Sequence, residues 1–143
     1  MLMPKKIKFR KVQRGNMRGI SKGARTVAFG EYGLQAVEPV WLTAAQIEAM
    51  RVALSRKLKK VGNFFLRVYP DKPISKKPAE TRMGKGKGGV DHWVAVVKRE
   101  RVICEVGGVD MATARDILKY VSYKLPLKTK FVQKDIKAEV RVS

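Results

Sequence analysis

The chain has 143 residues, the size of one ordinary domain, and its hydrophobic content of 45% is typical of a folded protein rather than a disordered one. No run of 18 or more apolar residues and no signal-peptide pattern occurs, so the sequence predicts a cytosolic protein with no membrane partner. Lys and Arg number 32 against 12 Asp and Glu, a net charge of +20, which predicts a polyanionic partner such as nucleic acid, because each neutralised phosphate releases counterions.

The first 25 residues are basic throughout and contain no acidic side chain. Their composition cannot build a hydrophobic core, so we expect an extended arm, residues 1–25, that becomes ordered on a polyanion. A merely solvated tail is the alternative. The arm side chains that we expect to contact the polyanion are Lys5, Lys6, Lys8, Arg10, Lys11, Arg14 and Arg18.

Residues 24–38 alternate weakly between polar and apolar side chains, which predicts two short strands with a turn near Gly30. A helix is predicted to begin after Thr43, because Thr43 and Gln46 match a capping box, and it should stop at Gly62. Its apolar face consists of Ile47, Met50, Leu54, Leu58 and Val61. The basic side chains of this helix that we expect to contact the polyanion are Arg51, Arg56, Lys59 and Lys60.

Residues 64–69 are rich in aromatic and branched side chains and predict a strand that Pro70 ends, followed by a long loop over residues 71–91. The loop has the glycine spacing of a dinucleotide site, but that site needs a strand before it and a helix after it, and neither is predicted here. Glycines instead let a backbone approach a crowded phosphate surface, and an unstructured loop is the alternative. The expected contact residues are Lys72, Lys76, Lys77, Arg82, Met83, Gly84, Lys85, Gly86, Lys87 and Gly88.

Residues 93–97 and 102–106 are expected to pair as a hairpin, although their turn lacks the glycine that tight hairpins favour. A second helix should begin at Asp110 and end at Pro126, and residues 129–133 predict a last strand. The sequence therefore predicts an α+β fold, with two helices packed on a mostly antiparallel sheet, a basic N-terminal arm and a long Gly/Lys-rich loop. The predicted divisions are the arm 1–25, a single globular domain 26–133 and a C-terminal tail 134–143.

No catalytic constellation is evident in the sequence, so we expect a protein that is not an enzyme and needs no cofactor. The single histidine, His92, and the single cysteine, Cys104, lack partners for catalysis or for a metal. Cys104 lies in an apolar run, which predicts a buried side chain. Two other classes stay open as alternatives. One is a DNA-binding nucleoid protein, although no helix-turn-helix or zinc finger is visible, and the other is a nucleotide-dependent enzyme.

One run in the long loop has the form of a family signature: Arg82-Met83-Gly84-Lys85-Gly86-Lys87-Gly88, with Trp93 after it. This run resembles the signature of bacterial-type large-subunit ribosomal protein sixteen. The segments Leu42–Glu48, Arg67–Pro73 and Lys124–Thr129 also resemble that family, and the resemblance covers residues 1–133. One strand departs from the family pattern, since Asn63-Phe64-Phe65 stands where Lys, an aliphatic residue and Trp are usual.

The resemblance implies a structural, rRNA-binding protein of the large ribosomal subunit. It implies contact with 23S-type rRNA at the base of the central protuberance, close to A-site tRNA, and a late assembly step that shapes the peptidyl-transferase region. P-site tRNA, neighbouring large-subunit proteins and 5S rRNA are further expected partners. The implied location is the ribosome in a bacterial cytoplasm, although an organelle-encoded relative would have the same sequence features.

Overall fold

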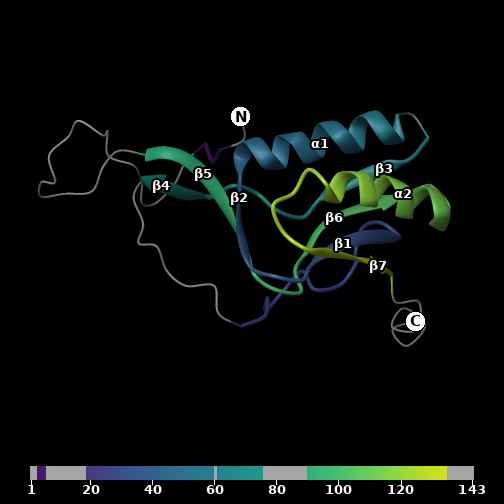
Figure 1. Ribbon diagram of the computed structural model, residues 1–143, viewed down its shortest axis with the longest axis horizontal. Coiled ribbons are helices and arrows are strands. Elements are labelled where there is room, and N and C mark those ends of the chain that lie inside the picture. Colours follow the sequence, from purple (N-terminus) through teal and green to yellow (C-terminus); the bar gives the residue numbers. More distant parts are fainter. Residues whose placement is uncertain (1–2, 6–18, 60, 76–89, 135–143) are drawn as a thin grey trace, which may run out of the picture.

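The computed structural model describes residues 3–5, 19–59, 61–75 and 90–134 (Figure 1). Over these residues the chain forms seven strands and two helices. The strands are β1 (Tyr32–Ala36), β2 (Val40–Thr43), β3 (Asn63–Leu66), β4 (Lys72–Ser75), β5 (Val90–Val97), β6 (Val102–Gly107) and β7 (Thr129–Gln133), and the helices are α1 (Ala44–Leu58) and α2 (Met111–Ser122).

The strands form two antiparallel sheets, where the sequence predicted a single mostly antiparallel one. The four-stranded sheet has the order β3-β6-β1-β7, and the three-stranded sheet has the order β2-β5-β4. Figure 1 shows α1 and α2 side by side on the four-stranded sheet, with the β4–β5 pair projecting from the opposite end of the molecule. The predicted α+β class with two helices is therefore confirmed.

The helix α1 begins as its sequence dictates. The amide of Gln46 donates to Thr43 Oγ1 at 3.2 Å and the amide of Thr43 donates to Gln46 Oε1 at 2.9 Å, which is the predicted capping box. The predicted end at Gly62 is wrong, because α1 stops at Leu58 and Lys59 leaves the helical conformation with φ of 49°. The predicted apolar face therefore loses Val61, whose side chain is 77% exposed.

The predicted hairpin between residues 93–97 and 102–106 is wrong. The strand β5 pairs with β2 and β4, whereas β6 pairs with β1 and β3. The link between them is tied to the end of β1, since the amide of Glu100 donates to the carbonyl of Ala36 at 2.8 Å and Glu100 has a positive φ of 72°. The link thus carries the chain from one sheet to the other, and β1 takes the place on β6 that a hairpin would have given to β5.

Several predicted boundaries also move. Only one strand, β1, forms within residues 24–38, so the first of the two predicted strands is absent. The predicted strand 64–69 already ends at Leu66 as β3. The predicted loop 71–91 begins and ends in strands, so Lys72 lies in β4. The helix α2 begins where predicted but ends before Pro126, and β7 matches the predicted last strand.

The hydrophobic core lies between the two helices and the sheets. Met50 and Leu54 of α1, Leu118 of α2 and Cys104 of β6 are all 0% exposed. The predicted burial of Cys104 is confirmed, and this burial raises the pKa of its thiol to about 12. One face of the four-stranded sheet thus packs against this core. Because successive side chains of a strand point to opposite faces, every second side chain points to the other face.

Candidate nucleic-acid interface

The residues predicted to contact a polyanion divide into those that the structure describes and those that lie outside the described ranges. The described ones are Lys5, Arg51, Arg56, Lys59 and Lys72. The others lie outside the described residues: Lys6, Lys8, Arg10, Lys11, Arg14, Arg18, Lys60, Lys76, Lys77, Arg82, Met83, Gly84, Lys85, Gly86, Lys87 and Gly88.

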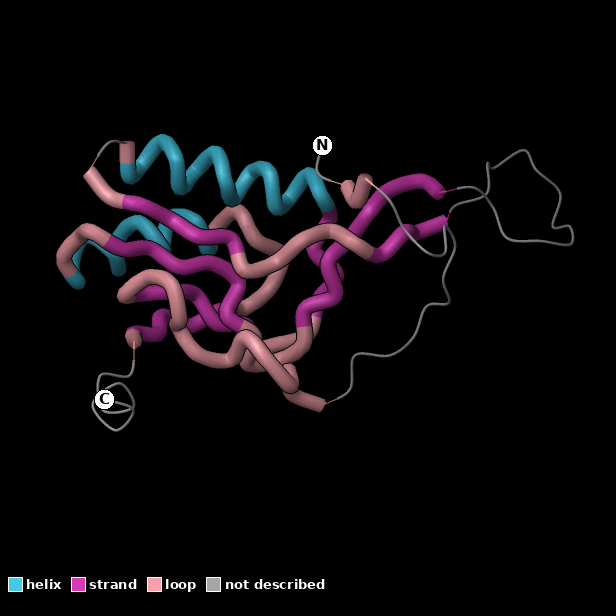
Figure 2. The backbone as a smooth tube through the Cα atoms, turned by 180° about the vertical axis from the view of Figure 1, so that it is seen from behind, coloured by secondary structure: helices cyan, strands magenta, loops and turns pink. Residues whose placement is uncertain are grey.

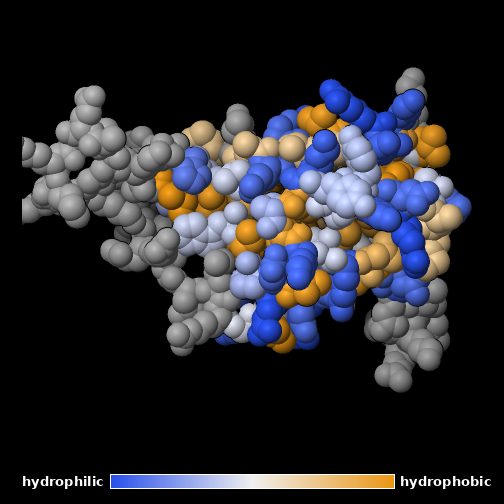
Figure 3. Space-filling view, viewed as in Figure 1, coloured by the Kyte–Doolittle hydropathy of each residue, from blue (hydrophilic) through white to orange (hydrophobic). Residues whose placement is uncertain are grey.

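The basic side chains of α1 are exposed, as their role as contacts requires. Arg51 and Arg56 lie on the solvent side of α1, and Lys59, which follows the last residue of the helix, is exposed as well. Arg51 Nη2 is 2.5 Å from Glu48 Oε1, and this hydrogen bond holds the pKa of the Glu48 carboxyl below its ordinary value. Figure 3 shows hydrophilic side chains over the helical side of the molecule, with hydrophobic ones between them. The helix therefore presents cations on a rigid element.

An open groove of 480 Å³ lies between α1 and the link from β3 to β4. Arg51, Arg67 and Arg101 bring three guanidinium groups to it. Phe29 and Tyr69 bring two aromatic rings, and these residues are 64% and 46% exposed. Only Arg51 was singled out from the sequence. The other four come from three segments far apart in the chain, and no local pattern connects them. We call these five residues the arginine groove.

Within the arginine groove, Arg101 is the guanidinium with the least satisfied surroundings. Its Nη2 donates to the carbonyl of Arg67 at 2.9 Å, while its Nε is buried and has no hydrogen-bond partner among the described residues. Burial and then the charge of Arg67 lower the pKa of Arg101, and Asp71 acts in the opposite direction. The groove thus holds a partly buried cation with an unused donor.

Beneath the groove, Glu105 of β6 is a fully buried carboxylate with 0% exposure. Its Oε1 accepts hydrogen bonds from the amides of Ala28, Phe29 and Gly30 at 2.9, 2.8 and 2.8 Å, and its Oε2 is paired with Arg67. Burial alone would raise the pKa of the Glu105 carboxyl, but these amides and the guanidinium together hold it below its ordinary value. We call this arrangement the Glu105 clasp. A glutamate inside the apolar run from Val102 to Val106 was the available sequence signal for it.

The Glu105 clasp holds the segment before β1 on the face of the sheet that the helices leave free, and Figure 2 shows this segment crossing the strands. Val27 is buried there, the amide of Val102 donates to the carbonyl of Ala24 at 2.6 Å, and the amide of Ser21 donates to the carbonyl of Arg99 at 2.9 Å. Arg25 forms an ion pair with Glu100 at 3.0 Å. The last residues of the predicted arm 1–25 therefore contact the domain, and the extended arm is a prediction for the residues before them.

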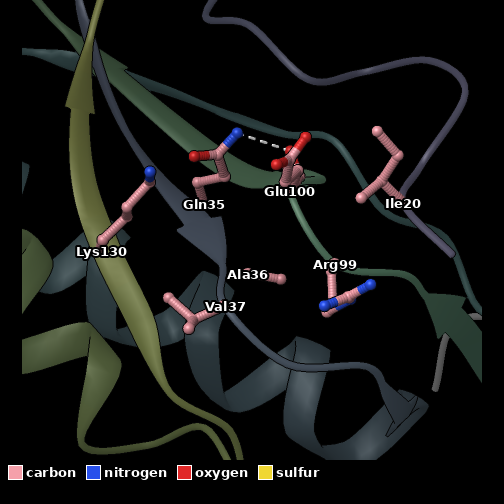
Figure 4. A pocket seen from close by; sticks show the side chains of 7 residues that line it. All are labelled: Ile20, Gln35, Ala36, Val37, Arg99, Glu100 and Lys130. Atoms are coloured by element: carbon pink, nitrogen blue, oxygen red, sulfur yellow. Dashed lines mark hydrogen bonds between the residues drawn. The ribbon is translucent and has the colours of Figure 1, made fainter.

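A smaller pocket of 200 Å³ lies where this segment meets β1 and β7 (Figure 4). Gln35 Nε2 donates to the carbonyl of Glu100 at 2.7 Å and to that of Arg25 at 3.0 Å, so its amide connects β1 to both of these segments. Arg99 and Lys130 supply the cations at its rim (Figure 4). The pocket adds positive charge to this side, and the Gln35 amide and the Glu100 carboxylate in it are already bonded to other protein groups.

The described residues contain no group of three or more His, Cys, Asp or Glu that could hold a metal ion. Within the same residues, no helix is long and apolar enough to cross a membrane. His92, in β5, is half-buried. What the described surface does offer is cations beside exposed aromatic rings, the combination that suits a nucleic acid.

Comparison with known protein families decides between the remaining interpretations. The model of the family described as ribosomal protein L16p/L10e matches residues 4–132. The chain belongs to this family. It is 56% identical over 134 residues to the large ribosomal subunit protein uL16 of Pseudothermotoga lettingae, with 94% of both chains covered. It is 56% identical to the uL16 of Petrotoga mobilis over 94% of this chain and 95% of the relative, and 53% identical to that of Heliobacterium modesticaldum over 94% of both.

Family membership confirms the resemblance to the large-subunit ribosomal protein sixteen family and the prediction of a structural protein rather than an enzyme. It overturns both alternatives, the nucleoid protein and the nucleotide-dependent enzyme. A strand, β4, does precede the glycine-rich loop, contrary to the prediction, but the next element that the structure describes is the strand β5, where a dinucleotide site needs a helix. The chain is therefore a ribosomal protein of the large subunit.

Proposed function

We propose that this chain binds 23S-type rRNA at the base of the central protuberance, beside A-site tRNA, in a bacterial cytoplasmic ribosome. Its partners there are the rRNA, A-site and P-site tRNA, 5S rRNA and neighbouring large-subunit proteins. It joins late in subunit assembly and shapes the peptidyl-transferase region. The observation that carries the proposal is the net charge of +20 on a chain of this family, with its described cations outside the core.

The arrangement of the described elements supports separate roles for the arm and for the loop. The domain holds the segment from residue 20 to β1 through the Glu105 clasp, so residues 6–18, with six cations and no acidic side chain, start from a fixed point. The β4–β5 pair projects from the body at the other end (Figure 1). The last residue pair of the two strands joins Ser75 to Val90, so the Gly/Lys-rich loop 76–89 connects the strands at this end of the pair. We propose that the arm anchors the protein in rRNA and that the loop reaches tRNA.

Reconstitution of large subunits that lack this protein tests the anchoring role. Replacing Lys6, Lys8 and Lys11 by Gln should weaken incorporation, because each neutralised phosphate contact contributes about 0.7–0.9 to the slope of log affinity against log salt. A matched variant, with Lys119, Lys124 and Lys128 replaced by Gln, removes the same charge from the domain surface. Equal incorporation of the arm variant and wild-type protein, with an unchanged salt slope, would contradict the proposed arm.

The variant Arg82→Ala tests the role of the loop. We expect its thermal unfolding to match that of the wild type, since an arginine beside glycines in a loop is not expected in the core. Ribosomes that carry the variant should bind A-site tRNA more weakly or assemble more slowly. The loop proposal fails if those ribosomes assemble, bind tRNA and translate like wild-type ribosomes.

A further inference from the structure

We propose that the arginine groove binds one strand of rRNA, with a backbone phosphate at Arg101 and an unpaired base stacked on Phe29 or Tyr69. This inference rests on the proposed rRNA-binding function and adds a site on the globular domain that is distinct from the basic residues of the arm and from the Gly/Lys-rich loop. It assigns an RNA-binding role to Phe29, Tyr69, Arg67 and Arg101, which no sequence pattern indicated. The argument begins with the state of the three guanidinium groups.

The three arginines of the groove differ in how far carboxylates already neutralise them. Arg67 is paired with the buried Glu105 and also donates to the carbonyl of Thr26. Arg101 has no carboxylate within ion-pair distance among the described residues, and Asp71 affects it only through its more distant charge. A phosphate in the groove would supply Arg101 with the anion that it lacks and would offset both its burial and its repulsion by Arg67.

Arg51 can join this contact at small cost. Its ion pair with Glu48 is exposed, with 44% and 37% of the two side chains accessible, and exposed pairs contribute little to stability. A guanidinium in such a pair can turn to a phosphate when RNA supplies one. The groove therefore offers one arginine that is ready for an anion and a second that can be recruited from α1.

The aromatic rings of the groove point to a nucleotide rather than an inorganic anion. The guanidinium of Arg67 lies 5.0 Å from the centroid of the Phe29 ring, and the Phe65 ring lies 5.8 Å from it, so Phe29 is held in place although the residue is 64% exposed. Tyr69 is held by its hydroxyl, which donates to the carbonyl of Met3 at 2.7 Å. Exposed rings that neighbouring groups hold in place are suitable platforms for unpaired bases, and single-stranded RNA is recognised through such stacking.

Continuity with the basic arm favours RNA over an acidic protein segment. The hydrogen bond from Tyr69 to Met3 places the start of the chain at the edge of the groove. The six cations of residues 6–18 follow within a few residues in the sequence. An acidic peptide could neutralise Arg101, but it would leave the two exposed rings without the flat partner that a base provides. A strand of rRNA can use the groove and the arm together.

Site-specific photo-crosslinking in reconstituted large subunits tests the proposal. A benzoylphenylalanine residue replaces Phe29 or Tyr69, and the control position is Tyr123, which is 74% exposed and lies at the end of α2, outside the groove. We expect both groove positions to crosslink to rRNA, and we expect Arg101→Gln to reduce the yield severalfold. Crosslinks from the groove to a ribosomal protein, or none to rRNA in subunits that have incorporated the chain, would overturn the proposal.

Binding measurements with large-subunit rRNA separate this proposal from the function on which it rests. Arg101→Gln and Phe29→Leu should each weaken binding about 5- to 10-fold, the latter through lost stacking. The control Arg115→Gln removes an arginine that lies outside the groove, 5.0 Å from the ring of Phe131. If Arg101→Gln fails to fold, Phe29→Leu still tests the groove, because Phe29 is exposed. Wild-type affinity for both groove variants refutes the groove alone, whereas failure of the unaltered chain to bind rRNA refutes the proposed function as well.

Discussion

Replacement of Glu105 by Gln should strongly destabilise the protein while changing its shape very little. The carboxylate accepts three amide hydrogen bonds and pairs with Arg67 at a site that is 0% exposed. A glutamine oxygen can still accept from the amides of residues 28–30. Its NH₂ group, however, would face the Arg67 guanidinium, so the substitution removes the charge and places a donor against a donor.

The magnitude follows from the burial of the pair. Removing one partner from a buried ion pair costs about 3–5 kcal/mol, because the other charge stays without compensation. The side chain of Arg67 keeps 16% exposure, so water can reach it and the lower end applies, about 3 kcal/mol. For a chain of this length, that loss lowers the melting temperature by about 10 °C. Glu105→Ala should cost more, because it also leaves three amide donors without their acceptor.

Thermal and urea unfolding of the free protein, with hydrogen exchange at residues 28–30, measure the effect. Glu31→Gln is the matched control, since it removes the same charge from an exposed side chain. The lowered pKa of Glu105 means that its stabilisation is complete above the ordinary carboxyl range and is lost as the pH falls below about 4. As the pH falls, Glu105→Gln should therefore lose less of its free energy of unfolding than the wild type loses. A melting temperature equal to that of Glu31→Gln would refute the proposed stabilising role of the clasp.

Three further predictions concern the domain. Gly33→Ala should destabilise it by about 2 kcal/mol or more, because the new Cβ would lie 2.8 Å from the carbonyl oxygen of Cys104. The control in the same thermal melts is Gly23→Ala, whose new Cβ would have no atom within 4 Å, and equal stability of the two variants would contradict the packing described. Leu54→Ala should cost about 2–5 kcal/mol in urea unfolding, whereas Val61→Ala should stay within about 0.5 kcal/mol. The buried thiol of Cys104, with a pKa of about 12, should react with thiol reagents only as the protein unfolds, and rapid labelling of the folded protein at pH 7 would disprove this.

Local signals in the sequence predicted the elements that depend on neighbouring residues. The capping box at Thr43 fixes the start of α1, and the beginning of α2 and the strand β7 also match their predictions. The end of α1 was missed because Lys59 turns the chain with a positive φ that its residue type does not predict. Val61, which continues the helical spacing, is exposed for that reason.

Contacts between distant segments could not be predicted in this way. The hairpin failed because the choice of partners for β6 depends on β1 and β3, which lie earlier in the chain. The first expected strand near Gly30 is replaced by a segment whose amides bind Glu105, 75 residues further along. The arginine groove is hidden for the same reason, since Phe29, Arg67 and Arg101 become neighbours only through the sheet.

The most direct test of rRNA binding measures how the affinity of the full chain for large-subunit cores that lack this protein depends on salt concentration. Binding is measured by co-sedimentation, and small subunits are the control. We expect the chain to sediment with the large-subunit cores and not with small subunits. The logarithm of its affinity should fall against the logarithm of salt concentration with a slope of magnitude about 5 or more, as several phosphate contacts require. Equal binding to both subunits, or an affinity that hardly changes with salt, would contradict the proposed role.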